Sequence, residues 1–140
     1  MKHFCSFSEA IREGAKLRPQ ARCLIFFAGR SCSVGAGLEA MGVPYKEYDS
    51  TAENLRAYAI AERVFPYLDS FSACPVTTCR RRDTLLNTVW HLNDHHGYTR
   101  EAVADWLESE EEKLGYITLV ESETVRTPVL AAKAERAAGG

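Results

Sequence analysis

The sequence predicts a small, mainly helical domain of the α+β class, with a minor two-stranded β element and a Cys/His site of the zinc type. Three observations support this class. Capping patterns open several segments with helical spacing of apolar residues, few apolar runs have the composition of strands, and two cysteines precede a histidine group at metal-ligand spacing. At 140 residues the chain suffices for one domain with its own core. We expect a single globular domain over residues 1–127 and a flexible, Ala-rich tail over residues 128–140.

Two capping boxes mark helices in the first half of the chain. The first, Ser6–Glu9, opens a segment with apolar residues at helical spacing that must end before Pro19. The second, Ser50–Glu53, opens a longer segment that stops at Pro66. In each box the serine side chain is expected to accept from the backbone of the glutamate, which reaches back in turn.

The segments between these helices predict one strand and one further helix. Residues 22–29 are apolar, aromatic and closed by Gly29, which favours a buried strand, and residues 116–120 form a second short strand that could pair with it. Residues 31–41 predict a helix with a face of small residues. Its Gly35-x-Gly37 pattern superficially matches a dinucleotide-binding fingerprint, but the glycines do not directly follow a strand, so we expect them to allow close helix packing instead.

A metal site is the sharpest expectation that the sequence supports. Cys74-x4-Cys79-x11-His91-x3-His95 is close to the spacing of a two-cysteine, two-histidine zinc site. His91 and His95 lie four residues apart on a predicted helix and therefore share a face. Such a site has no open coordination position, so the zinc ion would be structural rather than catalytic.

Three alternatives stay open at the metal site. His96 could replace His95, although its position predicts a partly buried core residue, or the cysteines could bind with only one histidine. The cysteine and histidine pairs could also be unrelated, because the middle spacing is one residue shorter than in a usual zinc finger. A hydrolytic zinc helix is disfavoured, because Leu92 stands where a metalloprotease has its glutamate.

Two further functional readings concern nucleic acid and cysteine chemistry. A second helix capped by Thr99 follows the histidine helix closely, which resembles a helix-turn-helix pair. Its expected outer face is acidic, through Glu101, Asp105, Glu108, Glu111 and Glu112, and would be repelled by phosphates. The run Arg80–Arg82 alone makes a weak phosphate site. Cys32 at a helix start could be an activated nucleophile, which would make the chain a cysteine-dependent enzyme.

Composition limits the location and the partners. The net charge is −2, so no general positive field draws the chain to nucleic acid or to anionic membranes. The longest apolar run, Cys23 to Ala28, is far too short to cross a bilayer. Five cysteines without a secretory signal favour a reducing cytoplasm, where cysteine pairs more often bind metal than form disulfides.

Three segments carry a resemblance: SEAIREGAKLRPQ, SCSVGAGLEAMG and WHLNDHHGYTREAVADWLE. Together they resemble small uncharacterised bacterial and phage-encoded proteins that share an HLND-x-H-x-(Trp/Tyr)-(Thr/Ser)-Arg-Glu block followed by ADWL. The resemblance implies a phage or mobile-element origin and a host-cytoplasmic location, and it transfers no catalytic residue. The favoured expectation is a non-enzymatic interaction protein that acts through protein contacts, ahead of a small nucleic-acid-binding regulator and of an enzyme using Cys32.

Overall fold

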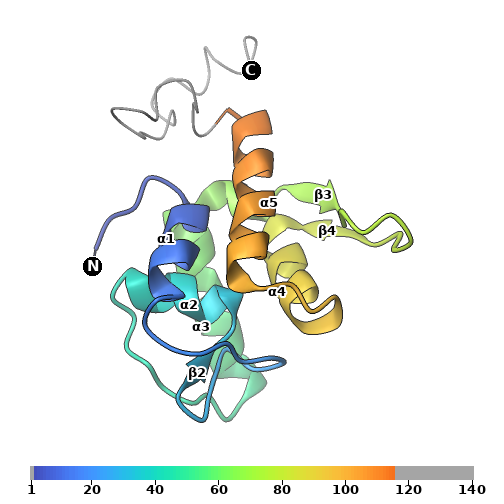
Figure 1. Ribbon diagram of the computed structural model, residues 1–140. Coiled ribbons are helices and arrows are strands. Elements are labelled where there is room, and N and C mark those ends of the chain that lie inside the picture. Colours follow the sequence, from blue (N-terminus) through green and yellow to red (C-terminus); the bar gives the residue numbers. More distant parts are fainter. Residues whose placement is uncertain (1, 116–140) are drawn as a thin grey trace.

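The computed structural model describes residues 2–115 and confirms the mainly helical α+β class (Figure 1). Two small antiparallel sheets, β1–β2 and β3–β4, accompany the helices in this range. The elements are α1 (Phe7–Gly14), β1 (Phe26–Phe27), β2 (Arg30–Ser31), α2 (Ser33–Ala40), α3 (Thr51–Val64), the 3-10 helix η1 (Pro66–Asp69), β3 (Phe71–Ala73), β4 (Arg82–Thr84), α4 (Leu85–His95) and α5 (Arg100–Lys113). The expected strand over residues 116–120 and the expected tail over residues 128–140 lie outside the described residues.

Both capping boxes form at the helix starts where the sequence predicts them. At α1 the hydroxyl of Ser6 accepts a hydrogen bond from the backbone of Glu9 at 3.2 Å, and the Glu9 carboxylate accepts from the backbone of Cys5 at 3.0 Å. The Ser50–Glu53 box at α3 repeats the arrangement, with Glu53 accepting from Asp49. These bonds satisfy backbone groups that a helix start otherwise leaves without partners.

Small residues let α1 and α2 pack almost backbone to backbone, as the sequence predicts. A Cβ atom added at Gly14 would lie 1.7 Å from the carbonyl oxygen of Ala36, and one added at Gly37 would lie 2.5 Å from the ring of Phe7. Both distances are well below van der Waals contact. The glycines of the fingerprint-like pattern therefore serve packing, as expected.

The apolar run over residues 22–29 is not the buried strand that its composition predicts. Only Phe26 and Phe27 are extended, and they pair with β2 in the register Phe26↔Ser31 and Phe27↔Arg30. Residue Cys23, at φ +70°, leaves the extended region, and Ala28 and Gly29 (φ +52° and +76°) turn the chain back. The apolar composition of a segment does not by itself predict where the backbone reverses direction.

The helix α5 does not present a uniformly acidic outer face. Glu111, expected on that face, is fully buried, and Glu108 is half-buried beside Arg12 at 2.7 Å. The Glu111 carboxylate accepts hydrogen bonds from the backbone and hydroxyl of Ser8 and from the hydroxyl of Tyr67. It therefore joins α5 to the start of α1 and to η1.

The hairpin β3–β4 lies on the other side of α5 from α1 (Figure 1). Its register pairs Phe71 with Thr84 and Ala73 with Arg82, so residues 74–81 form the connecting loop. Thr84 then caps α4 directly, which places the loop beside that helix. No helix within residues 2–115 is long and apolar enough to cross a membrane.

Candidate metal centre

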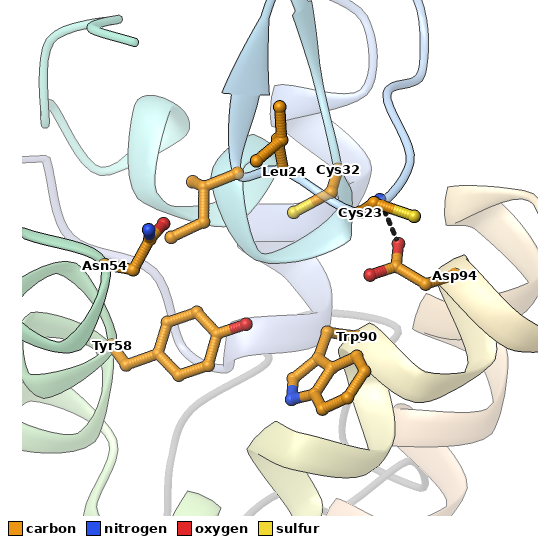
Figure 2. Close-up of a pocket in the computed structure, with 8 residues that line it drawn as sticks. Cys23, Leu24, Cys32, Asn54, Tyr58, Trp90 and Asp94 are labelled. Carbon is orange, nitrogen blue, oxygen red and sulfur yellow. Dashed lines mark hydrogen bonds between the residues drawn. The ribbon is translucent and has the colours of Figure 1, made fainter. Parts of the chain in front are cut away.

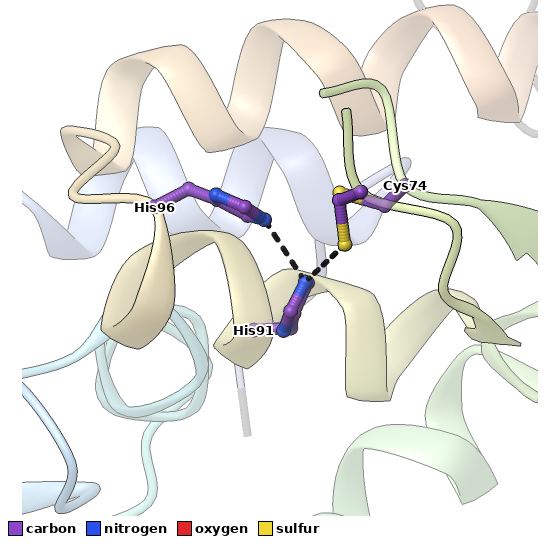
Figure 3. A group of neighbouring side chains, drawn as sticks. Cys74, His91 and His96 are labelled. Carbon is purple, nitrogen blue, oxygen red and sulfur yellow. Dashed lines mark hydrogen bonds between the residues drawn. The ribbon is translucent and has the colours of Figure 1, made fainter. Parts of the chain in front are cut away.

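The β3–β4 loop and the end of α4 bring two thiols and two imidazoles together (Figure 3). Cys74 follows the last residue of β3 and Cys79 lies further along the same loop. His91 lies on α4, and His96 is the C-cap residue that directly follows α4. One donor atom from each of these four side chains lies within 4.8 Å of the others.

Two distances between donor atoms of the cluster suit a tetrahedral ion. The Nε2 atoms of His91 and His96 are 3.1 Å apart, and Sγ of Cys79 lies 3.5 Å from Nε2 of His91. Zinc–nitrogen and zinc–sulfur bonds of ordinary length at tetrahedral angles place two nitrogens about 3.3 Å apart and a sulfur about 3.6 Å from a nitrogen. These two distances are therefore close to the edges of a zinc tetrahedron, and every other pair of donor atoms lies within 4.8 Å.

The fourth donor is His96 and not His95, which corrects the expectation drawn from helix spacing. His95 is exposed and outside the cluster, and its ring packs 5.7 Å from that of Trp90. The helical-face argument assumes that α4 continues through residue 96. Instead the backbone leaves helical geometry at His96 (φ −108°, ψ 0°) and Gly97 follows at φ +68°, so the His96 ring turns back toward His91.

Burial favours the neutral forms of Cys74 and His91. It raises the pKa of the Cys74 thiol, with the nearby Cys79 as a further cause. It lowers the pKa of His91, and the positive charge of Arg81 and the neighbouring histidines add to this effect. A neutral imidazole is the form that binds metal, whereas the thiols must lose their protons when a cation enters.

The chemistry of the donor set fits a structural zinc ion. Two thiolates and two imidazoles complete four-coordination and leave no site for water or substrate. Two facing Nε2 atoms 3.1 Å apart need either a shared proton or a cation between them, and a cation satisfies both at once. Nδ1 of His91 is buried and has no hydrogen-bond partner among the described residues, so the outer contact that usually orients a metal-bound histidine is lacking there.

The sequence reasoning missed the role of Asn93, which lies between the two histidines of the cluster. Asn93 is fully buried, accepts from Gln20 and Ser33, and donates to the backbone carbonyl of Ala21. The sequence contained a signal of this burial, because Asn93 lies four residues after Val89 and therefore on the apolar side of the helix. A polar residue at such a position needs hydrogen-bond partners from elsewhere in the fold.

Asp94 forms hydrogen bonds within the fold and none to a histidine of the range 2–115. Its Oδ1 atom accepts from the backbone of Cys23 at 2.8 Å and from the side chain of Asn93 at 2.8 Å. It therefore fixes the loop that precedes β1 against α4.

The structure contradicts an activated nucleophile at Cys32. Its side chain is 3% exposed, and burial raises its pKa to about 12. The sulfur accepts from the backbone of Gly35 at 3.4 Å and so acts as the N-cap of α2. A thiol this far from ionisation at neutral pH is a poor nucleophile.

Comparison with known proteins adds no functional assignment to this geometry. No protein-family model matches the chain, and no curated protein or solved structure shows significant similarity to it.

Proposed function

We propose that this chain is a non-enzymatic interaction protein of the phage or prophage type, held in shape by one structural zinc ion and acting through protein contacts. The observation that carries the proposal is the closed set of four donors, Cys74, Cys79, His91 and His96. A metal bound by four side chains stabilises a fold and does not activate water or substrate.

The position of the cluster supports a structural role. The hairpin β3–β4 has strands of only three residues each, which is too short for independent stability. An ion shared by its loop and α4 would fix the hairpin relative to the helical body. The proposed zinc ion would therefore replace the core that this part of the chain is too short to build.

Exposed aromatic side chains support contact with another protein. Phe71 on β3 is 67% exposed and Phe27 on β1 is 53% exposed. Large apolar side chains left in water are candidates for burial in a complex. All five cysteines are free, which agrees with the reducing host cytoplasm that we propose as the location.

A nucleic-acid-binding role has less support. Of the three consecutive arginines, Arg80 and Arg82 are exposed, whereas Arg81 pairs with Asp83 at 2.9 Å. Two exposed cations supply little of the phosphate neutralisation that such binding needs. The outward residues of α5, including Glu101 and Glu112, add negative charge.

Cobalt substitution tests whether the site is closed. We expect Co²⁺ in place of zinc to give the absorption of tetrahedral thiolate coordination, and azide to leave the spectrum unchanged. A spectrum that shifts on addition of azide would reveal an open position and would favour an enzyme instead.

Photocrosslinking tests the protein contact. A photoreactive amino acid replaces Phe71 in the full-length chain, expressed in the host cell, and Glu101 serves as the matched exposed control position. We expect a discrete crosslinked protein from position 71 only, and none when His96 is also changed to Ala. Identical products from both positions would contradict a contact at the hairpin.

A further inference from the structure

A cavity separate from the metal cluster lies where α3, α4 and the loop before β1 meet (Figure 2). Its volume is about 220 Å³, which is enough for a small organic group. The cavity is lined by Cys23, Leu24, Ile25, Cys32, Asn54, Tyr58, Trp90 and Asp94.

The lining combines aromatic rings with one negative charge. Tyr58 reaches in from α3 and Trp90 from α4, so two aromatic side chains face one space from different helices (Figure 2). Asp94 is the one charged side chain among the lining residues. Aromatic rings beside a carboxylate attract organic cations through the ring quadrupole and the full charge together.

Two polar groups point into the cavity without a protein partner. Oδ1 of Asp94 accepts hydrogen bonds from Cys23 and Asn93. Oδ2 of Asp94 and the hydroxyl of Tyr58 have no hydrogen bond to any residue of the range 2–115. Tyr58 is half-buried, so its hydroxyl is not simply in bulk water. The cavity thus presents two free acceptors for a donor that the fold itself does not supply.

Neither of the two nearby arginines forms an ion pair with Asp94. Arg22 donates to the backbone carbonyl of Asn93 at 2.5 Å and is not among the lining residues. Arg81 stacks 5.2 Å from the centre of the Trp90 ring, and its charge is paired with Asp83 at 2.9 Å. Arg81 thus lies against the Trp90 ring, and the carboxylate of Asp94 has no ion-pair partner among residues 2–115.

We propose that this cavity binds an alkylammonium group, with Asp94 as the charged acceptor, Tyr58 as the second acceptor and Trp90 as the aromatic wall. The group could belong to a free amine or to a lysine side chain of a partner protein, because both offer the same cation on a methylene chain. Leu24 and Ile25 provide the apolar wall that such methylenes require.

Fluorescence of Trp90 tests the proposal in the full-length chain. The variant Trp106→Phe leaves Trp90 as its one tryptophan, since the sequence has two. We titrate it at pH 7 with n-butylammonium, with 1-butanol as the uncharged analogue, and with Nα-acetyl-lysine methylamide. We expect a saturable change with n-butylammonium at about millimolar concentration and none with 1-butanol. A response to the blocked lysine as well would identify a protein side chain as a competent source of the cation, and a response to the free amine alone would identify a small molecule.

Two carboxylate variants assign the effect to the cavity. Asp94→Asn keeps an oxygen for the backbone of Cys23 but removes the charge, so we expect affinity about tenfold weaker. The matched control Asp105→Asn removes an exposed carboxylate on α5 and should change nothing. Should Trp106→Phe not fold, the indole N–H resonance of Trp90 in the otherwise unchanged protein gives the same titration.

Equal binding of n-butylammonium and 1-butanol would overturn the proposal. So would equal affinity of the Asp94 variant and the parent, or the absence of saturation up to about 100 mM ligand. None of these results would alter the cobalt spectrum, so failure here is distinguishable from failure of the proposed zinc site.

Discussion

Oδ1 of Asn93 accepts two hydrogen bonds from Ser33, one from its hydroxyl at 2.8 Å and one from its backbone nitrogen at 3.1 Å. Ser33 is the first residue of α2, so a side chain of α4 satisfies the start of another helix. The same amide accepts from Gln20 at 2.8 Å and donates to the carbonyl of Ala21 at 2.9 Å. A single side chain thus ties the loop before β1 and the helix α2 to the helix of the proposed metal ligands.

Replacement of Asn93 by Ala should destabilise the fold strongly. The substitution leaves polar groups of Ser33 and Ala21 buried without this partner, while the half-buried Gln20 keeps its bond to Tyr98. We expect a loss of about 3 kcal/mol in the free energy of unfolding. Urea denaturation measures it. The control His95→Ala, on the same helix but exposed, should change stability by less than about 0.5 kcal/mol. Equal stability of the two variants would contradict the role assigned to Asn93.

Cys32 should resist alkylation in the native protein. It is buried and its pKa is raised to about 12, whereas Cys23 is exposed on the preceding loop. Iodoacetamide at pH 7 followed by mass spectrometry should modify Cys23 and leave Cys32 unmodified until denaturant is added. Labelling of Cys32 faster than Cys23 in the folded chain would instead restore the cysteine-dependent enzyme as a candidate.

The helices were predictable because their signals are local. The capping boxes Ser6–Glu9 and Ser50–Glu53 form hydrogen bonds that span only a few residues. The small residues Gly35 and Gly37 likewise indicate close helix packing directly from the sequence. The strand predicted over residues 22–29 is shortened to Phe26–Phe27 by the positive φ angles at Cys23 and Ala28. The backbone of Cys23 is held by the side chain of Asp94 on α4, which local sequence does not reveal.

The candidate site was predictable in composition and less so in geometry. Spacing along the chain identified Cys74, Cys79 and His91 as neighbours, and the structure brings these three together. The fourth donor depends on where α4 ends, and helix ends are the least reliable feature of sequence reasoning. The burial of Glu111 could not be inferred either, because its partners Ser8 and Tyr67 lie on elements distant in the sequence.

The buried carboxylate Glu111 should make stability depend on pH. Burial raises its pKa from 4.5 to about 7, so the folded chain keeps this proton over a range in which the unfolded chain has released it. The unfolded state then binds fewer protons, and stability falls as pH rises from about 4.5 to about 7. The variant Glu111→Gln imitates the protonated form. We expect it to match the parent near pH 4.5 and to exceed it by about 3 kcal/mol near pH 8.

The neighbouring Glu112 provides the control for this pH dependence. It is exposed, so Glu112→Gln should follow the parent at every pH. Urea denaturation across the pH range gives the differences, in which the titration of other groups cancels. A constant difference between Glu111→Gln and the parent from pH 4.5 to pH 8 would contradict the raised pKa.

Adjacent histidines on one helix end give the most direct test of the metal centre. His96 lies in the donor cluster and His95 outside it, so His96→Ala should lose bound zinc while His95→Ala retains about one ion per chain. A chelator should lower the melting temperature of the parent and of His95→Ala by about 10 °C or more, because the binding free energy of a structural ion is part of the folding free energy. The same chelator should leave His96→Ala unchanged, since that variant has no ion to lose. Elemental analysis of the purified chains together with thermal denaturation gives both quantities. Zinc retained by His96→Ala and lost by His95→Ala would contradict this assignment. It would show that His95 is the fourth ligand and that α4 continues one residue further when the ion is bound.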